Sequence, residues 1–289
     1  MTASPTPRRS TPAASSRSTA SSCRARARGP CVTDGARGEG PALELVGLVK
    51  EFRGRRVVHG LSLSVPRGSL FGMVGPNGAG KTTTLSMATG LLRPDGGTAR
   101  VLGHDVWADP AAAKAVMGVS PDGLRLFEQL SGRELLHYVA DLRRMPVEES
   151  RPRAEELLAV LDLAADANTV VADYSAGMVK KISLAAALIH APRLLVLDEP
   201  FEAVDPVSGQ TIRTILRRYV GTGGTVVMSS HVMELVEGLC DRVAVVAGGR
   251  VLADDTVGAL TAGGSLHERF LELVGASEVS GDGLTWLGG

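Results

Sequence analysis

The sequence predicts an α/β fold with a mainly parallel β-sheet, and three observations support this prediction. Apolar segments typical of buried strands alternate with segments of helical periodicity, which favours parallel strands joined by helical crossovers. A glycine-rich turn at residues 75–83 follows the apolar segment 70–74 and precedes a helical segment. Two carboxylates, Asp198 and Glu199, follow the apolar segment 194–197, and ligands of open α/β sheets lie beyond the carboxyl ends of the strands.

Local patterns then predict each element in order. Strands are expected where apolar residues alternate or form short runs, and helices where they recur every three or four residues behind a capping residue. The predicted strands are 43–49, 57–65, 70–74, 116–120, 194–198, 225–229 and 242–247, the last forming the sheet edge together with a turn at residues 248–249. The predicted helices are 81–89, 131–144, 153–161, one that starts at Pro206, one that ends near Cys240, and 265–274.

The glycine-rich turn fits the phosphate-binding pattern G-x-x-x-x-G-K-[ST]. Its glycines allow a tight turn in which backbone N–H groups surround a phosphate. Lys81 would place positive charge on the β and γ phosphates, Thr82 would offer a hydroxyl to Mg²⁺, and the following helix would direct its dipole at the anion. The alternative is a chance match in a glycine-rich chain, which the flanking strand and helix disfavour. The candidate nucleotide-binding residues are Gly75, Pro76, Asn77, Gly78, Ala79, Gly80, Lys81, Thr82 and Thr83.

Two carboxylates at the end of a predicted strand form a second candidate group. Asp198 and Glu199 directly follow the apolar residues 194–197. A strand end exposed to solvent is an equally good explanation when this pair is considered without the rest of the chain. Together with a phosphate-binding turn, the pair favours chemistry, in which Asp198 holds Mg²⁺ through water and Glu199 polarises the attacking water.

Composition excludes several other classes of protein. The 289 residues carry 31 basic and 31 acidic side chains, so the formal net charge is zero and nucleic acid is not expected as a partner. Three cysteines are too few and too scattered for a disulfide framework or a zinc site. No apolar run reaches about 18 residues, the length needed to span a membrane. Cys240 is expected to be a buried residue that packs in the core rather than a reactive thiol.

The two ends of the chain differ in composition from its centre. Residues 1–40 are rich in Ser, Arg, Pro and Ala with almost no large aliphatic side chains, which predicts a disordered tail. An organelle transit peptide is the alternative for this acid-poor segment, although an amphipathic apolar face is missing. Residues 276–289 are predicted to be a flexible, glycine-rich tail, in which Trp286 has no explanation.

Further motifs along residues 41–275 resemble the ATP-binding subunits of ABC transporters. Residues 174–178, Tyr-Ser-Ala-Gly-Met, are similar to the signature usually written Leu-Ser-Gly-Gly-Gln. Residues 202–205 resemble the D-loop, His231 the switch histidine, and Phe52 an aromatic residue that stacks on adenine. The resemblance implies a P-loop NTPase of the ABC ATPase type, with a mainly parallel core, an antiparallel β subdomain and an inserted α-helical subdomain at about 123–175.

The resemblance also implies roles and partners. The cofactors are ATP and Mg²⁺, with Glu199 and His231 as catalytic residues and Thr82, Asp122 and Asp198 as metal ligands. The signature residues Ser175 and Gly177, together with Asp205, would contact the nucleotide of a second subunit, because two subunits of the family pair head to tail. The implied assembly is a homodimer or heterodimer of ATPase subunits on a transmembrane permease, at the cytoplasmic face of the cell membrane.

The chain departs from the family pattern at two places. Asp122 falls where the family has the glutamine of the Q-loop, and its charge would act on the γ-phosphate; at an effective dielectric of about 20, a unit charge pair 4 Å apart is worth about 4 kcal/mol. Ala176 replaces a frequent glycine of the signature. If residue 176 needed a positive φ, alanine would cost about 1 to 2 kcal/mol, but the retained Ser175 and Gly177 indicate that it does not.

Three functions compete at this stage. The first is an ATPase subunit that energises a separately encoded permease, with an exporter favoured by the Tyr-Ser-x-Gly-Met form of the signature. The second is a soluble ABC ATPase acting on ribosomes or DNA, although such proteins usually carry two ATPase domains or a long insertion. The third is an ATP-binding regulator whose hydrolysis is weakened by Asp122.

Overall fold

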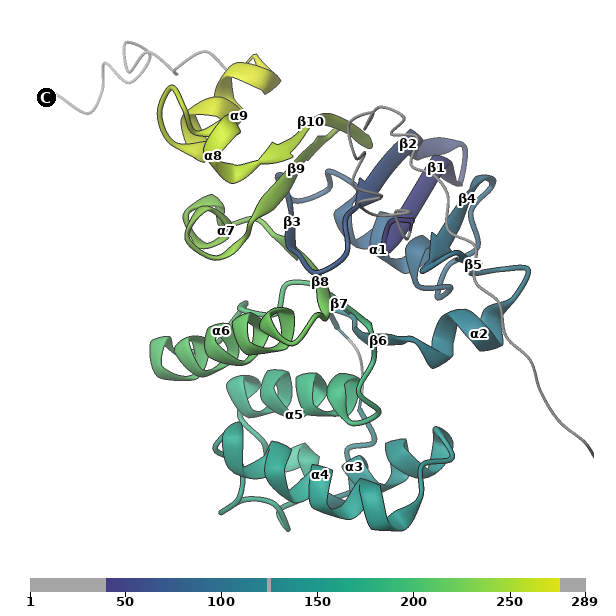
Figure 1. Ribbon diagram of the computed structural model, residues 1–289. Helices are drawn as coiled ribbons and strands as arrows, with labels where there is room; N and C mark the ends of the chain where they lie inside the picture. Colours follow the sequence, from purple (N-terminus) through teal and green to yellow (C-terminus); the bar gives the residue numbers. More distant parts are fainter. Residues whose placement is uncertain (1–39, 124–125, 276–289) are drawn as a thin grey trace, which may run out of the picture. The chain divides into compact units, whose positions relative to one another are not determined.

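A six-stranded sheet forms the centre of the computed structural model, which describes residues 40–123 and 126–275 (Figure 1). Its strand order is β10-β9-β3-β8-β7-β6. All neighbours from β9 to β6 pair in parallel, and only β10 is antiparallel to its neighbour. The strands are β3 (Leu70–Val74), β6 (Met117–Ser120), β7 (Leu194–Leu197), β8 (Thr225–Ser230), β9 (Arg242–Ala247) and β10 (Arg250–Thr256).

A second, antiparallel sheet has the order β2-β1-β4-β5 and lies beside α1 in Figure 1. Its strands are β1 (Leu43–Phe52), β2 (Arg55–Val65), β4 (Gly96–Val101) and β5 (His104–Asp105). The sequence predicted β1 and β2 but not β4 or β5. β4 begins with two glycines and β5 has only two residues, so hydrogen bonding to β1 and to each other, rather than an apolar pattern, defines these strands.

One strand prediction was wrong. The sheet does not end at β9, because β10 pairs with it in antiparallel fashion, from Arg250 opposite Ala247 to Thr256 opposite Arg242. The turn at Gly248 and Gly249 has positive φ at both residues and closes a hairpin instead of ending the sheet. The polar residues that dominate the second half of β10 explain why its sequence gave no strand signal.

Most of the helices lie where the apolar periodicity predicts them. A capping box opens α3, since Ser131 Oγ accepts from Glu134 N and the Glu134 carboxylate accepts from Ser131 N. The expected start of α4 at residue 153 was wrong, because the helix begins at Val147 and accommodates Pro152 within its second turn. The helices are α1 (Lys81–Ala88), α2 (Pro110–Ala115), α3 (Gly132–Leu142), α4 (Val147–Val160), α5 (Ala176–Leu188), α6 (Pro206–Gly221), α7 (Met233–Leu239), α8 (Val257–Leu260) and α9 (Leu266–Val274).

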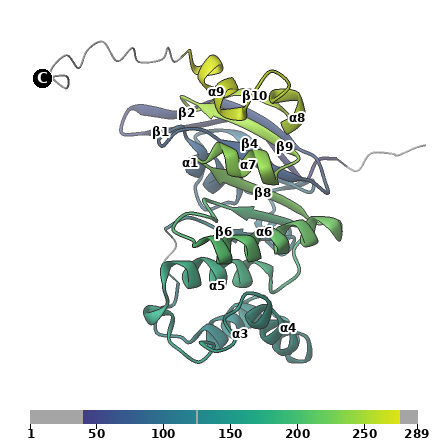
Figure 2. The same cartoon turned by 90° about the vertical axis from the view of Figure 1, so that its left-hand side faces the viewer.

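Both faces of the parallel sheet are buried, as is usual for such sheets. Leu70 and Val74 of β3 pack with α5, α6 and α7 on one face, whereas Phe71 and Met73 pack with α1 and the antiparallel sheet on the other. On the first face, α5 lies between the sheet and the pair α3–α4 (Figure 2). The buried Cys240 belongs to this first core, and burial raises the pKa of its thiol well above the usual range.

The predictions for residues 1–39 and 276–289, including Trp286, lie outside the described residues. Within the described ranges, no helix combines the length and the apolar character that a membrane crossing requires.

His190 provides a test of the packing between α5 and the sheet. Its Nε2 lies 3.1 Å from the carbonyl oxygen of Met117, and its Nδ1 is buried without a hydrogen-bond partner among the described residues. Burial, and to a lesser extent the nearby Arg143, lower the pKa of His190 from 6.5 to about 4. The unfolded chain therefore binds a proton between these pH values and the folded chain does not. We expect stability to fall as the pH drops from about 6.5 to about 4, by roughly 2 kcal/mol after allowance for solvent contact.

Urea unfolding of the wild type and His190→Gln across this pH range measures the effect. The variant should lose most of the slope, because glutamine does not titrate. The matched control is His267→Gln at an exposed position of α9, and an equal loss of slope in this control would contradict the assignment to His190.

Candidate functional site

The glycine-rich turn connects β3 to α1 at the carboxyl edge of the parallel sheet. Gly78 and Gly80 have φ values of 80° and 99°, which glycine adopts without strain. A Cβ at Gly75 would lie 2.0 Å from the carbonyl oxygen of Val246, so no side chain fits there. The glycines at these three positions are therefore required by the path of the chain.

Lys81 is the first residue of α1, and its side chain is only 6% exposed. Its Nζ donates to the carbonyl oxygen of Gly75 at 2.7 Å and lies 3.6 Å from Glu199 Oε1. The first hydrogen bond of the helix runs from Thr84 N to Gly80 O, so the N–H groups of residues 81–83 have no partner within the helix. Together with the ammonium group, these N–H groups form an anion site.

The register of the sheet places Asp198 beside Ser229. Leu197 of β7 pairs with Met228 of β8, so the next residues of the two strands are neighbours as well. Ser229 Oγ donates to the carboxylate of Asp198 and accepts from Glu199 N at 2.9 Å. Asp198 is 5% exposed and Ser229 is fully buried. One serine hydroxyl therefore holds both acidic residues of the predicted pair.

Glu199 lies between two groups that can carry positive charge. Its Oε1 faces Lys81 at 3.6 Å, and its Oε2 lies 3.0 Å from His231 Nδ1. The side chain of Glu199 is 12% exposed, whereas that of His231 is 40% exposed. The backbone of Glu199 is left-handed, with φ of 47°, a costly conformation for a residue with a side chain and one that is concentrated at functional sites.

A cavity of about 300 Å³ opens between these groups. Several chain segments that are far apart in the sequence meet at this cavity. Asp198 does not line this cavity and instead faces a hollow of about 10 Å³ behind it, with Ser120 and Thr89. The cavity is lined by Val57, Asn77, Gly78, Ala79, Gly80, Lys81, Thr82, Thr83, Asp122, Glu199, Glu202 and His231.

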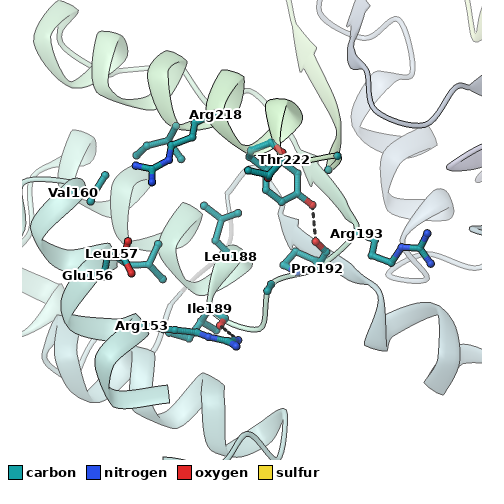
Figure 3. Close-up of a pocket in the computed structure, with 15 residues that line it drawn as sticks. Arg153, Glu156, Leu157, Val160, Leu188, Ile189, Pro192, Arg193, Arg218 and Thr222 are labelled. Atoms are coloured by element: carbon teal, nitrogen blue, oxygen red, sulfur yellow. Dashed lines mark hydrogen bonds between the residues drawn. The ribbon is translucent and has the colours of Figure 1, made fainter. Parts of the chain in front are cut away.

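A larger hollow, of about 630 Å³, lies away from the phosphate-binding turn (Figure 3). It is formed by α4, the end of α5 and the C-terminal part of α6, with apolar walls that include Leu157, Leu188 and Ile215. Tyr219 lines this hollow, and its hydroxyl donates to the carbonyl oxygen of Pro192 at 2.8 Å. No residue of the phosphate-binding turn lines this hollow, so size does not identify the nucleotide site here.

Asp122 lines the nucleotide cavity but is already engaged. Its Oδ1 accepts from Lys180 Nζ at 2.9 Å, and the same ammonium group donates to the carbonyl oxygen of Glu199 at 3.0 Å. The carboxylate charge that the sequence introduces at this position therefore has a partner within the same chain.

The signature residues lie elsewhere on the surface. Ser175 caps α5, its Oγ accepting from Met178 N at 3.3 Å, and it is exposed. A Cβ at Gly177 would lie 3.6 Å from Asp205 Oδ2. Asp205 caps α6, and hydrogen bonds from Ser208 and then Val207 lower the pKa of its carboxyl group. None of these three predicted site residues lines the cavity around Lys81.

Ala176 is the first residue of α5 and is not among the described residues with positive φ. The expectation that this position needs no positive φ is confirmed. Phe52 ends β1, is 45% exposed, and lies with its ring 5.5 Å from Lys50 Nζ. It does not line the cavity, so the structure does not bring this predicted residue to the other site residues.

Sequence reasoning missed two residues that organise the site. Ser229 could have been found as a polar residue at the end of an otherwise apolar strand, next to the strand that carries Asp198. Lys180 follows the signature in the sequence, and its contacts become visible only when α5 is packed against the ends of β6 and β7.

The fold and the cavity define a nucleotide-binding protein of the P-loop class, as predicted. The chain belongs to the ABC transporter family, because the model of that family, described as ABC transporter, matches residues 58–202. It carries the ATP-binding and ATP-hydrolysing domain of this family, which confirms the resemblance noted from the motifs.

Relatives and a solved structure support this membership. The chain is 41% identical over 219 residues to the daunorubicin/doxorubicin resistance ATP-binding protein DrrA of Streptomyces peucetius, a match that covers 76% of this chain and 66% of that protein, just under two thirds. It is 38% identical to a Nod factor export ATP-binding protein I of Rhizobium sp. (strain N33), covering 76% of this chain and 72% of that protein. A solved structure described as an ATP binding subunit of an ABC transporter has a TM-score of 0.76 at 27% identity, and the match covers 81% of this chain and 99% of that one.

Ser229 provides a test of how the acidic pair is held. Ser229→Ala removes the donor to Asp198 and the acceptor of Glu199 N–H, so it should destabilise the fold by about 1 to 3 kcal/mol and slow ATP hydrolysis by at least about tenfold. Thermal unfolding and steady-state hydrolysis measure the two effects.

The control is Thr225→Val at the other end of β8, where a buried hydroxyl accepts from Gly68 N at 2.9 Å. This variant should lose stability with little change in the rate of hydrolysis. Equal loss of rate in both variants would show that Ser229 acts through general stability and not through the acidic pair.

Proposed function

We propose that the protein binds ATP with Mg²⁺, hydrolyses it, and thereby energises a separately encoded transmembrane permease that exports its substrate. The observation that carries this proposal is the position of Glu199, between Lys81 and His231 at the mouth of the phosphate-binding cavity. The names of the two relatives, which concern drug resistance and Nod factor export, support an exporter.

The residues present fit the proposed cofactors. The anion site formed by Lys81 and the free N–H groups at the start of α1 suits the phosphates of a nucleotide. The exposed hydroxyl of Thr82 lies at the cavity, and the buried carboxylate of Asp198 lies behind it. Hydroxyl and carboxylate oxygens are ligands that Mg²⁺ accepts, and a water molecule between Asp198 and the ion suits its preference for retained waters.

Glu199 and His231 are the proposed catalytic residues. A bound Mg²⁺ would supply charge stabilisation to the phosphates. The carboxylate of Glu199 orients the attacking water by accepting a hydrogen bond from it. His231 holds that carboxylate in place through the 3.0 Å contact. Lys81 offsets negative charge on the opposite side of Glu199.

A second subunit is proposed to complete the site. Ser175 and Gly177 lie at the exposed N-terminus of α5 and do not line the chain's own cavity, yet a helix N-terminus attracts anions. A head-to-tail homodimer or heterodimer would place this end of α5, and Asp205 beside Gly177, against the nucleotide of the other subunit.

The proposed place of work is the cytoplasmic face of the cell membrane, on the permease. The layer formed by α3 and α4 is joined to the sheet through α5 (Figure 2), and we propose that it passes the motion of the ATP site to the permease. Nucleic acid is not expected as a partner, since the formal net charge is zero. The hypothesis of a regulator with weakened hydrolysis was based on the charge of Asp122. Because that charge is paired with Lys180, it no longer favours this hypothesis.

Glu199→Gln tests the proposed chemistry. The variant keeps the shape of the side chain but loses its basicity, so hydrolysis should fall by at least about a hundredfold while ATP still binds. Steady-state phosphate release and calorimetric ATP binding measure the two quantities. Since nucleotide then persists at the interface, light scattering should detect an ATP-dependent dimer.

The control is Glu234→Gln, an exposed residue of the short helix after His231 that does not line the cavity. It should hydrolyse ATP at the wild-type rate. Wild-type protein that releases no phosphate, or a Glu199→Gln variant that retains the wild-type rate, would contradict the proposal.

Phe52→Ala tests whether the exposed ring at the end of β1 stacks on adenine. Losing such a contact should cost about 0.5 to 1.5 kcal/mol, up to about tenfold in affinity for ATP. Tripolyphosphate has no base and should bind wild type and variant equally. Equal weakening for both ligands would assign Phe52 to local packing instead.

A further inference from the structure

One lysine joins three segments that meet at the candidate site. Lys180 lies in the second turn of α5, and its Nζ donates to Asp122 Oδ1 at 2.9 Å and to the carbonyl oxygen of Glu199 at 3.0 Å. Asp122 follows β6 and Glu199 follows β7. A single side chain from α5 therefore ties together the ends of two neighbouring strands.

The first consequence concerns the backbone of Glu199. Its left-handed conformation, with φ of 47°, is costly and persists only when its surroundings fix it. The N–H of Glu199 is held by Ser229 Oγ, and its carbonyl oxygen is held by Lys180 Nζ. Because both adjoining peptide groups are fixed, the carboxylate stays between Lys81 and His231.

The second consequence concerns charge. Asp122 lines the cavity together with Lys81 and Thr82, so an uncompensated carboxylate there would repel an anionic nucleotide. The ammonium group of Lys180 lies 2.9 Å from this carboxylate, and the side chains of Lys180 and Asp122 are 20% and 40% exposed. Partial burial limits the screening of the pair by salt.

We propose that Lys180 is a positioning residue for ATP hydrolysis with two separable effects. Through the Glu199 carbonyl oxygen it fixes the catalytic carboxylate, and through Asp122 it keeps the phosphate-binding cavity accessible to an anion. The first effect acts on kcat and the second on KM. This inference rests on the proposed ATPase function.

The competing explanation is that Lys180 and Asp122 form an ordinary surface ion pair, which would contribute little to stability or to catalysis. The chain offers a matched example. Lys50 Nζ donates to Asp95 Oδ1 at 2.9 Å and to the carbonyl oxygen of Arg93 at 2.9 Å. Lys50 therefore has the same kinds of partner as Lys180, one carboxylate and one carbonyl oxygen, but it does not line the cavity.

The experiment measures kcat and KM for Mg-ATP with full-length variants. Lys180→Met should lower kcat about tenfold and raise KM about tenfold, since both contacts are lost. Asp122→Asn should retain a higher kcat than Lys180→Met, because Lys180 still holds the carbonyl oxygen of Glu199. In the double variant KM should return to within about twofold of the wild type, while kcat stays as low as in Lys180→Met.

Lys180→Gln separates the effects in a second way. Its amide retains a donor for the Glu199 carbonyl oxygen but carries no charge, so KM should rise with a smaller loss of kcat than in Lys180→Met. This variant also serves if methionine at this position lowers the unfolding temperature below the assay temperature.

Lys50→Met is the control and should keep the wild-type kcat at saturating ATP. Since Lys50 lies over the ring of Phe52, the comparison is made in kcat and not in KM. A Lys180→Met kcat within about twofold of the wild type, in a preparation where Glu199→Gln abolishes hydrolysis, would overturn the inference and leave the proposed function intact. A double variant whose KM stays as high as in Lys180→Met would overturn the charge effect. Wild-type protein without hydrolysis would instead contradict the proposed function.

Discussion

The parallel pairing of β3, β8 and β7 is the constraint on which the site depends. Val74 lies opposite Ser230, and Leu197 lies opposite Met228, so the residues that follow each strand emerge side by side at one edge. A shift of one residue in the pairing of β7 with β8 would separate Asp198 from Ser229 and would move the side chains of the shifted strand to the opposite faces of the sheet. The apolar residues that fill both faces of the sheet therefore also fix the position of the acidic pair.

Electrostatics then decides what this edge can hold. Carboxylates and an anionic ligand would repel one another, but two of the three carboxylates that line the cavity lie against basic side chains: Glu199 against Lys81 and His231, and Asp122 against Lys180. Asp198 is stabilised differently, by the hydroxyl of buried Ser229. Glu199, Asp122 and Asp198 therefore do not present their full charge to a phosphate.

The features that could be predicted from the sequence are those fixed by residues close together in the chain. The phosphate-binding turn was predictable because close backbone approach at Gly75 and positive φ at Gly78 and Gly80 demand glycine. The strands β4, β5 and β10 were not, because they lack a continuous apolar pattern and are defined by their hydrogen bonds to neighbouring strands. The contacts of Ser229 and Lys180 depend on how separate elements pack, and no local pattern encodes them.

The helix α5 connects two properties that the sequence presents separately. Its N-terminus carries the exposed Ser175 and the half-buried Gly177, while Lys180, one turn further on, contacts Asp122 and the Glu199 carbonyl oxygen of the chain's own site. Its apolar face, through residues such as Ile182 and Ala185, packs in the core shared with α3 and α4. A rigid helix cannot move at one end without moving at the other. Any force on the exposed end of α5 therefore acts on Lys180 and, through it, on the backbone that positions Glu199.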